Sequence, residues 1–554
     1  MTDIPKQQQA VQLVGPDELV FNDSKEVFEP GPHQILCRVE ATGLCFSDLK
    51  LLKQFSAHVR KGPIESGLDL GILDEIPSYV PCAKPTVPGH EAVVIVVQVG
   101  LEVEDYKIGQ RYLVQADYRW LKTATSNGAF GYNFEGALQE YVLMDERVIT
   151  SPEGDSMLLP ASVDHSAAAI ALAEPWACVE EAYANKERQT IKNNSKMLII
   201  AETAIDDNAL SDLFDNYGKP GNITWLGEGA AADPGVPVTE LSDKTELLDA
   251  EYDDVVYFGS QAETVEMLFD KVALDGILNI VLCGGKFGCE INAKVGRVHY
   301  GGIRVIGTVG SAPADSMKNI PATDEIRTGD KINVIGAGGP MGIMHVIRNI
   351  CQGVEGVTVF AGDVDDERLA ALSKIAVPLA EKNKVTYKTY NAKTNKIAEA
   401  FDYIALMAPI PALVSQAIQD TASKGLINIF AGIPATVVGA LDLDAYIEKQ
   451  LYFIGTSGST LDDLKLVLDK VETDQLDTNV SVAAISGLAG AVEGIRAVEN
   501  RLIAGKILVY PACKDIPLTK LGELQDKYPN VAKCLNDGLW TKKAEDALLK
   551  HHSS

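Results

Sequence analysis

The feature that most restricts the fold of this chain is an internal duplication. From residue 195 onward, apolar runs typical of buried strands alternate with stretches typical of helices, which predicts parallel α/β units. The offset between the two copies grows from 135 residues at Lys196 and Lys331 to 148 at Gly310 and Gly458. Buried parallel strands all resemble one another, but four matches in one order favour a duplicated doubly wound unit over chance. The matching segments are 196–200 with 331–335, 252–253 with 401–402, 276–280 with 425–429 and 306–311 with 454–459.

A chain of 554 residues is too long for one hydrophobic core. Residues 11–185 consist mostly of strand-like runs separated by Gly and Pro turns, which predicts a compact β domain with long loops. We therefore expect four parts, which are a β domain over 1–190, a first α/β repeat over 191–325, a second over 326–475, and a return to the β domain with a helical tail over 476–554.

Charge and cysteine usage exclude several classes of function. The formal net charge of −28 would repel a phosphate backbone or an anionic bilayer, so we expect neither a nucleic-acid nor a membrane partner. No apolar run approaches the ~20 residues that span a bilayer, and residues 1–9 lack the apolar stretch of a signal peptide. The nine cysteines are scattered and form no Cys-x-x-Cys pair, which is typical of free thiols in the cytoplasm.

The second repeat contains a candidate dinucleotide-binding loop between a strand at 332–335 and a helix from 343 to about 351. Glycines there let the backbone approach a pyrophosphate, and the helix N–H groups point at it. Asp363 lies 21 residues after Gly342, near the spacing of a ribose-binding acid, and its charge favours NAD over NADP. A tight turn without a ligand is the alternative. The candidate cofactor-binding residues are Gly336, Ala337, Gly339, Pro340, Met341, Gly342 and Asp363, with Ala337 at the usual first glycine unless Gly336 takes that role.

The corresponding loop of the first repeat differs in the residues that matter for a nucleotide. Ala204 and Asp207 replace Gly339 and Gly342, and together with Glu202 and Asp206 the loop would block and repel a pyrophosphate. We therefore predict that the first repeat keeps the fold without the nucleotide. Our hypothesis is that it acts as a packing module in the place of a second subunit.

The β domain contains a candidate metal site made of residues far apart in the sequence. A thiolate, an imidazole and a carboxylate form the ligand set of a catalytic zinc with one open position. Taken alone, Cys45 has an ordinary explanation as a buried cysteine, His90 as part of a turn, and Glu174 as the start of a helix. If an alcohol substrate binds the zinc, Ser47 is a candidate for passing its proton towards solvent. Glu91 is either an alternative ligand or a group that supports the ligands. The candidate metal ligands are Cys45, His90 and Glu174, and the candidate catalytic residues are Ser47 and Glu91.

With these residues the chain resembles the zinc-dependent medium-chain dehydrogenases/reductases, and within them the L-sorbose 1-phosphate reductase-like branch. The resemblance covers residues 11–185 and 326–510 and implies a GroES-like catalytic domain with two tandem Rossmann-like doubly wound domains, the first degenerate. The motifs that carry it are Cys45-x-Ser47, Gly89-His90-Glu91, Gly109-Gln-Arg111, Leu172-Ala-Glu-Pro175, Gly339-Pro-Met-Gly342, Asp363-Val-Asp-Asp-Glu-Arg-Leu369, Asn428-Ile-Phe-Ala-Gly432 and Gly455-Thr-Ser-Gly458.

The resemblance implies hydride transfer between NAD(P) and a secondary alcohol or ketone of a polyol, sugar or sugar phosphate. It also implies one zinc rather than two, since residues 112–136 contain no cysteine for a structural zinc, and it implies a homo-oligomer. Residues 53–82 form an insertion beside the site that we expect to reshape the substrate pocket. The alternatives are a zinc-independent quinone or enone reductase of the same fold, and a non-catalytic scaffold that uses the duplicated domain.

Overall fold

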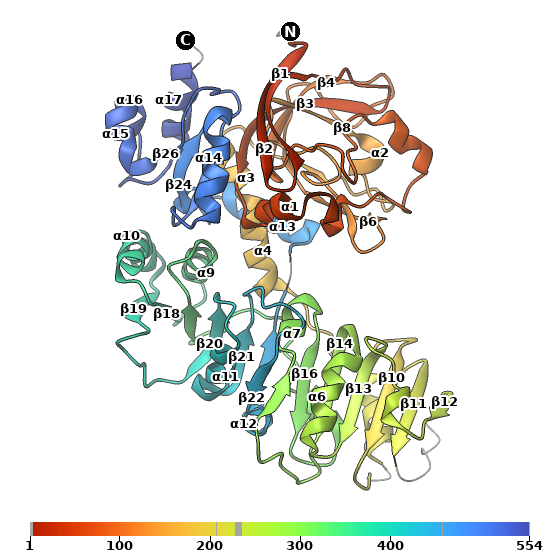
Figure 1. Ribbon diagram of the computed structural model, residues 1–554. Helices are drawn as coiled ribbons and strands as arrows, with labels where there is room; N and C mark the ends of the chain where they lie inside the picture. Colours follow the sequence, from red (N-terminus) through yellow and green to blue (C-terminus); the bar gives the residue numbers. More distant parts are fainter. Residues whose placement is uncertain (1–3, 206–207, 228–234, 457, 553–554) are drawn as a thin grey trace. The chain divides into compact units, whose positions relative to one another are not determined.

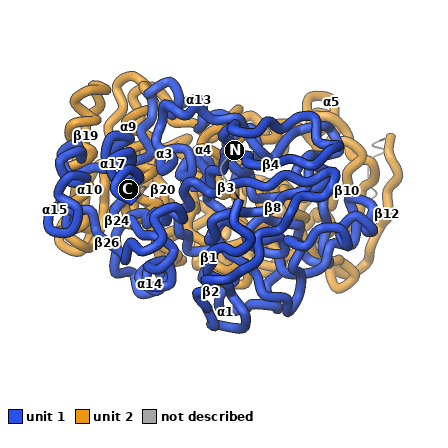
Figure 2. Tube along the Cα trace, turned by 90° about the horizontal axis from the view of Figure 1, so that it is seen from above, with its two compact units in different colours: residues 1–177, 459–554 blue, residues 178–458 orange. Residues whose placement is uncertain are grey.

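The computed structural model describes residues 4–205, 208–227, 235–456 and 458–552 (Figure 1). The chain forms two compact units, which are coloured separately in Figure 2. Unit 1 contains residues 1–177 and 459–554, and unit 2 contains residues 178–458. No helix among the described residues is both long and apolar enough to cross a bilayer.

Unit 1 is built on an eight-stranded sheet in the order β26-β24-β25-β3-β4-β5-β9, with β8 also paired to β3. The strand β25, from near the end of the chain, pairs antiparallel with β3, so Leu508 lies opposite Gly43. The strands are β1 (Gln7–Gly15), β2 (Glu18–Glu26), β3 (Gln34–Gly43), β4 (Glu91–Val99), β5 (Arg111–Val114), β6 (Asp117–Lys122), β7 (Asn127–Ala129), β8 (Tyr141–Asp145), β9 (Leu158–Pro160), β24 (Val482–Ser486), β25 (Lys506–Val509) and β26 (Thr519–Lys520). The helices are α1 (Phe46–Gln54), α2 (Glu146–Ile149), α3 (Ala167–Ala171), α4 (Ala173–Ala184, which continues into unit 2), α13 (Leu461–Glu472), α14 (Leu488–Glu499), α15 (Leu524–Lys527), α16 (Pro529–Ala532) and α17 (Lys542–His552).

Unit 2 contains two six-stranded parallel sheets with the same strand order, β12-β11-β10-β13-β14-β16 and β19-β18-β17-β20-β21-β23. This confirms the predicted tandem doubly wound units. The first comprises β10 (Lys196–Ala201), α5 (Ala209–Tyr217), β11 (Asn222–Gly227), β12 (Val238–Glu240), β13 (Tyr252–Phe258), α6 (Ala262–Lys271), β14 (Val272–Val281), β15 (Ile291–Ala293), α7 (Gly296–Tyr300), β16 (Arg304–Thr308) and α8 (Pro313–Met317). The second comprises β17 (Lys331–Ile335), α9 (Pro340–Cys351), β18 (Thr358–Asp363), α10 (Asp366–Asn383), β19 (Thr386–Asn391), β20 (Phe401–Leu406), α11 (Pro411–Asp420), β21 (Thr421–Asn428), β22 (Gly439–Leu441), α12 (Leu443–Glu448) and β23 (Tyr452–Ile454).

Some element boundaries differ from the sequence expectation. The helix expected over 262–274 ends at Lys271, because Val272 takes extended backbone angles and is already the first residue of the buried strand β14. The helix expected from 343 begins three residues earlier, at Pro340, whose fixed φ suits the first turn of a helix.

Candidate functional site

The thiol of Cys45 is placed by the start of a helix. Cys45 follows β3 and is the N-cap residue of α1, with extended backbone angles. Its backbone N–H donates to Asp48 Oδ2 at 3.0 Å, which fixes the direction in which the chain enters the helix. The Cys45 thiol therefore lies at the amino terminus of α1.

The imidazole of His90 is held from one side, so that its other nitrogen is presented to the thiol. His90 is buried directly before β4, and its Nδ1 lies 3.1 Å from Asp48 Oδ1. Its Nε2 lies 3.1 Å from Ser47 Oγ, and the same hydroxyl donates to Cys45 Sγ at 3.0 Å. Asp48 therefore orients two candidate ligands at once, a role that sequence reasoning missed. The available signal was an acidic residue three positions after a helix-capping residue.

The carboxylate of Glu91 is fully buried at the first position of β4. One oxygen, Oε1, accepts a hydrogen bond from the ammonium group of Lys506 on β25. The other oxygen, Oε2, has no hydrogen-bond partner among the described residues. Burial by itself would lower the pKa of Lys506, but the charges of Glu91, Cys45 and Glu174 and the hydrogen bond to Glu91 together outweigh burial and hold that pKa above its ordinary value.

The donor atoms of Cys45, His90 and Glu91 converge. One ligand atom from each residue lies within 4.8 Å of the other two. A buried carboxylate oxygen without a donor is costly, and a divalent cation held by all three groups would satisfy Glu91 Oε2. The donor set therefore fits a zinc ion.

Glu174 lies outside that group of three, although the sequence analysis placed it among the ligands. It is the second residue of α4 and is partly exposed. Burial raises the pKa of its carboxyl to about 7, with the charge of Glu91 acting in the same direction and that of His90 opposing it. Glu174 therefore lies close enough to Glu91 and His90 for both charges to shift the pKa of its carboxyl.

The insertion over residues 53–82 contributes side chains next to these groups. His58 stacks on the ring of Tyr132 with centroids 5.2 Å apart, and the guanidinium of Arg60 lies 5.3 Å from the same ring. Tyr132 in turn lies 5.6 Å from the His90 ring. Arg60 also forms an ion pair with Asp117 at 2.7 Å. The insertion therefore brings a cation to the surroundings of the candidate metal site.

The glycine-rich loop of the second repeat has the tight-turn geometry that its sequence suggests. Gly336 has a φ of +87°, in the left-handed region, so it makes the tight turn after β17. A Cβ on Gly342 would lie 2.2 Å from the carbonyl oxygen of Gly336, so the helix approaches the turn as closely as glycine allows. Gly339 is the N-cap of α9, and Ala337 is fully buried. Gly336 thus stands at the turn, and Ala337 packs beneath it.

Asp363 is the last residue of β18 and is tied into this loop. Its Oδ2 accepts a hydrogen bond from the N–H of Gly338 at 2.8 Å, and its Oδ1 accepts from the N–H groups of Val364 and Asp365. The carboxylate therefore holds the glycine loop against the end of β18. The ribose-binding role expected for Asp363 stays a prediction.

In the first repeat a carboxylate fills the corresponding loop. Glu202 stands at the position of Ala337, and its Oε1 accepts from Thr264 Oγ1 at 2.8 Å. Its two oxygens also accept from Lys244 Nζ and Tyr257 Oη. Asp206 and Asp207 lie outside the described residues.

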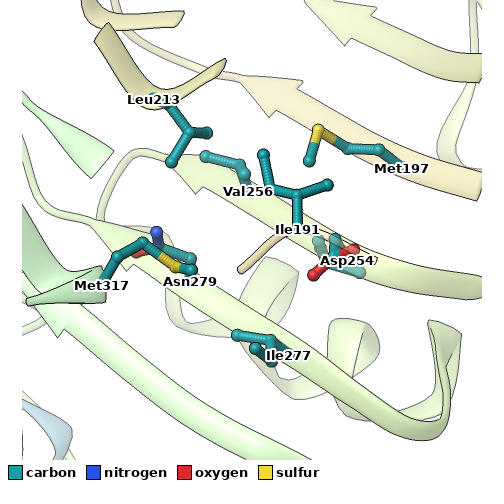
Figure 3. Close-up of a pocket in the computed structure, with 9 residues that line it drawn as sticks. Ile191, Met197, Leu213, Asp254, Val256, Ile277, Asn279 and Met317 are labelled. Carbon is teal, nitrogen blue, oxygen red and sulfur yellow. The ribbon is translucent and has the colours of Figure 1, made fainter. Parts of the chain in front are cut away.

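A small cavity elsewhere in the first repeat does not resemble a ligand site (Figure 3). Most of the side chains around it are apolar, and the carboxylate of Asp254 on its wall is bound by Arg188 at 2.7 Å. The residues that line the cavity are Ile191, Met197, Leu213, Asp254, Val255, Val256, Ile277, Asn279 and Met317. We interpret it as a packing gap between β10, β13, β14 and the helices that cover them.

Parts of the chain are similar to known proteins. Residues 31–153 match the alcohol dehydrogenase GroES-like domain. The chain is 28% identical over 245 residues to the uncharacterised protein YggP of Escherichia coli, covering 40% of this chain and 57% of that protein. It is 26% identical over 229 residues to L-sorbose 1-phosphate reductase of Klebsiella pneumoniae, covering 39% of this chain and 54% of the reductase. The chain thus spans little more than half the length of these relatives.

The fold is also that of known dehydrogenases. The crystal structure of 2R,3R-butanediol dehydrogenase from Bacillus subtilis superposes with a TM-score of 0.52 at 15% identity, covering 91% of this chain and all of that one. The amino-terminal domain is a GroES-like domain of the alcohol dehydrogenase type. The fold agrees with the resemblance to the medium-chain dehydrogenases/reductases given in the sequence analysis.

Proposed function

We propose that the protein is a zinc-dependent oxidoreductase that transfers a hydride between NAD(P) and a secondary alcohol or ketone of a polyol, sugar or sugar phosphate. The observation that carries the proposal is the convergence of the Cys45, His90 and Glu91 donor atoms within 4.8 Å. Thiolate, imidazole and carboxylate together suit a catalytic zinc and leave room for a fourth ligand.

Cys45, His90 and one carboxylate would hold the metal. Glu91 through Oε2 is the favoured third ligand, and Glu174, another acid near the site, is the alternative. When bound, zinc acts as a Lewis acid that lowers the pKa of an alcohol and so favours release of hydride to a nicotinamide.

The chain's own residues orient the ligands and move the proton. Asp48 holds Nδ1 of His90, which keeps Nε2 directed at the site. Ser47 Oγ contacts both Cys45 Sγ and His90 Nε2, so this hydroxyl can accept the proton that the substrate alcohol loses and pass it to solvent. Lys506 balances the charge of Glu91 inside the protein.

The second repeat would bind the nucleotide. The turn at Gly336 and the N-terminus of α9 at Gly339, Pro340, Met341 and Gly342 suit a pyrophosphate, with Ala337 packed beneath. Asp363 at the end of β18 would bind the adenosine ribose and favour NAD over NADP, since its charge repels a 2′-phosphate.

A phosphorylated substrate has separate support. One relative is an L-sorbose 1-phosphate reductase, and the insertion places Arg60 beside Tyr132 near the metal ligands. None of the described cysteines forms a disulfide, which supports a reducing compartment such as the cytoplasm.

The experiment is a substrate screen with matched variants. The wild-type protein is assayed with polyols and sugar phosphates, with NAD⁺ and with NADP⁺, by the absorbance of the reduced nicotinamide. We expect Cys45→Ser to lower turnover by about 100-fold or more, because removal of a ligand weakens metal binding. Cys289→Ser, a change of an exposed cysteine outside the candidate site, should leave turnover unchanged.

Two results would contradict the proposal. Full activity in protein without bound metal would indicate a zinc-independent reductase of the same fold. Failure of the wild-type chain to bind NAD(H) would indicate a scaffold.

A further inference from the structure

The two repeats of unit 2 meet along corresponding edges. The strand β15 of the first repeat pairs antiparallel with β22 of the second, and the residues opposite each other include Asn292 and Ala440. These two residues are 148 positions apart, which is the offset between the repeats in this region. Each therefore occupies the same place in its own repeat. Pairing of a position with its own equivalent is what a two-fold axis produces.

The helices next to this edge repeat the same symmetry. A Cβ on Gly307 of β16 would lie 2.7 Å from Ile447 Cγ1 of α12. The equivalent glycine, Gly455, directly follows β23, and a Cβ on it would lie 3.0 Å from the Cα of His299 of α7. His299 occupies the position of Ile447 in the first repeat. Each repeat thus packs its short helix onto the glycine of the other.

A third pair of contacts is also reciprocal. Asp444 of the second repeat accepts hydrogen bonds from the N–H groups of Phe287 and Gly288 in the first. The equivalent of Asp444 is Gly296, where a Cβ would lie 2.2 Å from the carbonyl oxygen of Pro434, in the matching loop of the second repeat. One hydrophobic core also runs through both repeats. Residues i and j exchange roles across the contact, as in the interface of a symmetric dimer.

We propose that the first repeat is a built-in partner subunit, which occupies the edge where a second copy of the chain would otherwise bind and positions the loop 429–434 of the second repeat. The chain is then a monomer in solution, in place of the homo-oligomer that its family resemblance implies. The positioning role rests on the proposed function, whereas the partner role rests on the contacts alone.

The loop 429–434 lies where a nicotinamide is expected. It follows β21, at the carboxyl edge of the sheet, and the strand order reverses between β17 and β20. A dinucleotide lies across such a reversal, so the half opposite Asp363 extends over β20 and β21. Nδ1 of His299 lies 3.2 Å from the carbonyl oxygen of Ile429, and a Cβ on Gly432 would lie 2.7 Å from Tyr300 Oη. The helix α7 therefore holds this loop at both ends.

Only one of the two repeats suits a nucleotide, so each chain should bind one. The carboxylate of Glu202 fills the loop of the first repeat with its own hydrogen bonds to Tyr257 and Thr264. The first repeat accordingly supports the nucleotide site of the second repeat without binding a nucleotide itself.

The test combines mass and nucleotide binding on the full chain. Light scattering after size-exclusion chromatography should give about the chain mass of 59.5 kDa, and an NADH fluorescence titration should give one site per chain. His299→Ala should weaken NADH binding about two- to tenfold, the effect of one lost hydrogen bond. His299→Asn, which keeps a donor in the same place, should restore most of it. Lys318→Ala, which changes the exposed residue directly after α8 of the first repeat, is the control and should bind as the wild type does.

Two results would overturn the inference. A mass of twice the chain would remove the partner role, and equal NADH affinity of His299→Ala and Lys318→Ala would remove the positioning role. If the wild-type chain binds no NAD(H), the proposed function and the positioning role both fail, while the measured mass still decides the partner role.

Discussion

The buried ion pair between Glu91 and Lys506 gives a prediction that can be worked out from the structure. The side chains are 0% and 7% exposed, so neither charge is solvated if the other is removed. In the metal-free protein, Lys506→Met should lower the free energy of unfolding of unit 1 by about 3–5 kcal/mol, because it leaves Glu91 as an uncompensated buried charge. Glu91→Gln should cost a similar amount, since Lys506 is then left unpaired.

The double variant isolates the pair from other effects. Glu91→Gln together with Lys506→Met buries no charge, so its loss of stability should be smaller than the sum of the two single losses by about 2 kcal/mol or more. The assay is urea unfolding of chelator-treated protein, followed by tryptophan fluorescence. Lys53→Met is the control, because Lys53 makes its ion pairs with Asp17 and Glu499 on the surface and its loss should change stability little.

Two results would contradict this expectation. If Lys506→Met costs less than about 1 kcal/mol, or if the two single losses add up in the double variant, the pair does not hold Glu91 in its buried position. There would then be no reason to regard Glu91 Oε2 as kept free for a cation by the ion pair with Lys506.

Three further predictions test other parts of the site. Asp363→Ala should reduce any preference for NAD over NADP, measured as the ratio of kcat/KM for the two nucleotides, and a wild-type preference for NADP would show that our interpretation of Asp363 is wrong. Arg60→Ala should raise KM about tenfold or more for a phosphorylated substrate but not for the unphosphorylated polyol, since a charge-assisted hydrogen bond is worth about 1.5–3 kcal/mol; an equal change for both would mean that Arg60 only supports Tyr132. Burial, together with the charge of Glu187, raises the pKa of Asp324 to about 9, so the wild type should lose stability as pH rises from about 4 to about 9, as the carboxyl ionises in the unfolded chain but not in the folded one. Asp324→Asn should melt like the wild type at pH 5 but at a higher temperature at pH 9, and parallel melting profiles would contradict this assignment.

Local features of this molecule could be predicted from the sequence. The buried strands of both repeats are continuous apolar runs, and the glycine turn at Gly336 lies between such a run and a helix, so neighbouring residues were enough to find them. The duplication was visible for the same reason. Helix ends were less certain, since Val272 continues the apolar pattern of α6 while starting a strand.

The arrangement of the candidate metal site could not be predicted in the same way. The choice between Glu91 and Glu174 depends on Lys506, which lies 415 residues after Glu91 and reaches it through the pairing of β25 with β3. The role of Asp48 depends on contact with His90, 42 residues later. No local pattern encodes contacts at such distances along the chain.

The reciprocal contact between the repeats is a third example. The match between the copies showed that they share a fold, but it did not show that Asn292 would lie opposite its own equivalent, Ala440. That contact is made by β15 and β22, which lie outside the two six-stranded sheets and form a two-stranded sheet of their own, and only the three-dimensional arrangement shows it.

The measurement that tests the central claim most directly is the zinc content of the purified chain by inductively coupled plasma mass spectrometry, taken together with NAD(P)-linked turnover. The account predicts about one zinc per chain in the wild type, little zinc in Cys45→Ser, and loss of turnover in proportion to the zinc lost. A fully active wild type without zinc would contradict it, and so would a Cys45→Ser variant that keeps both its zinc and its turnover.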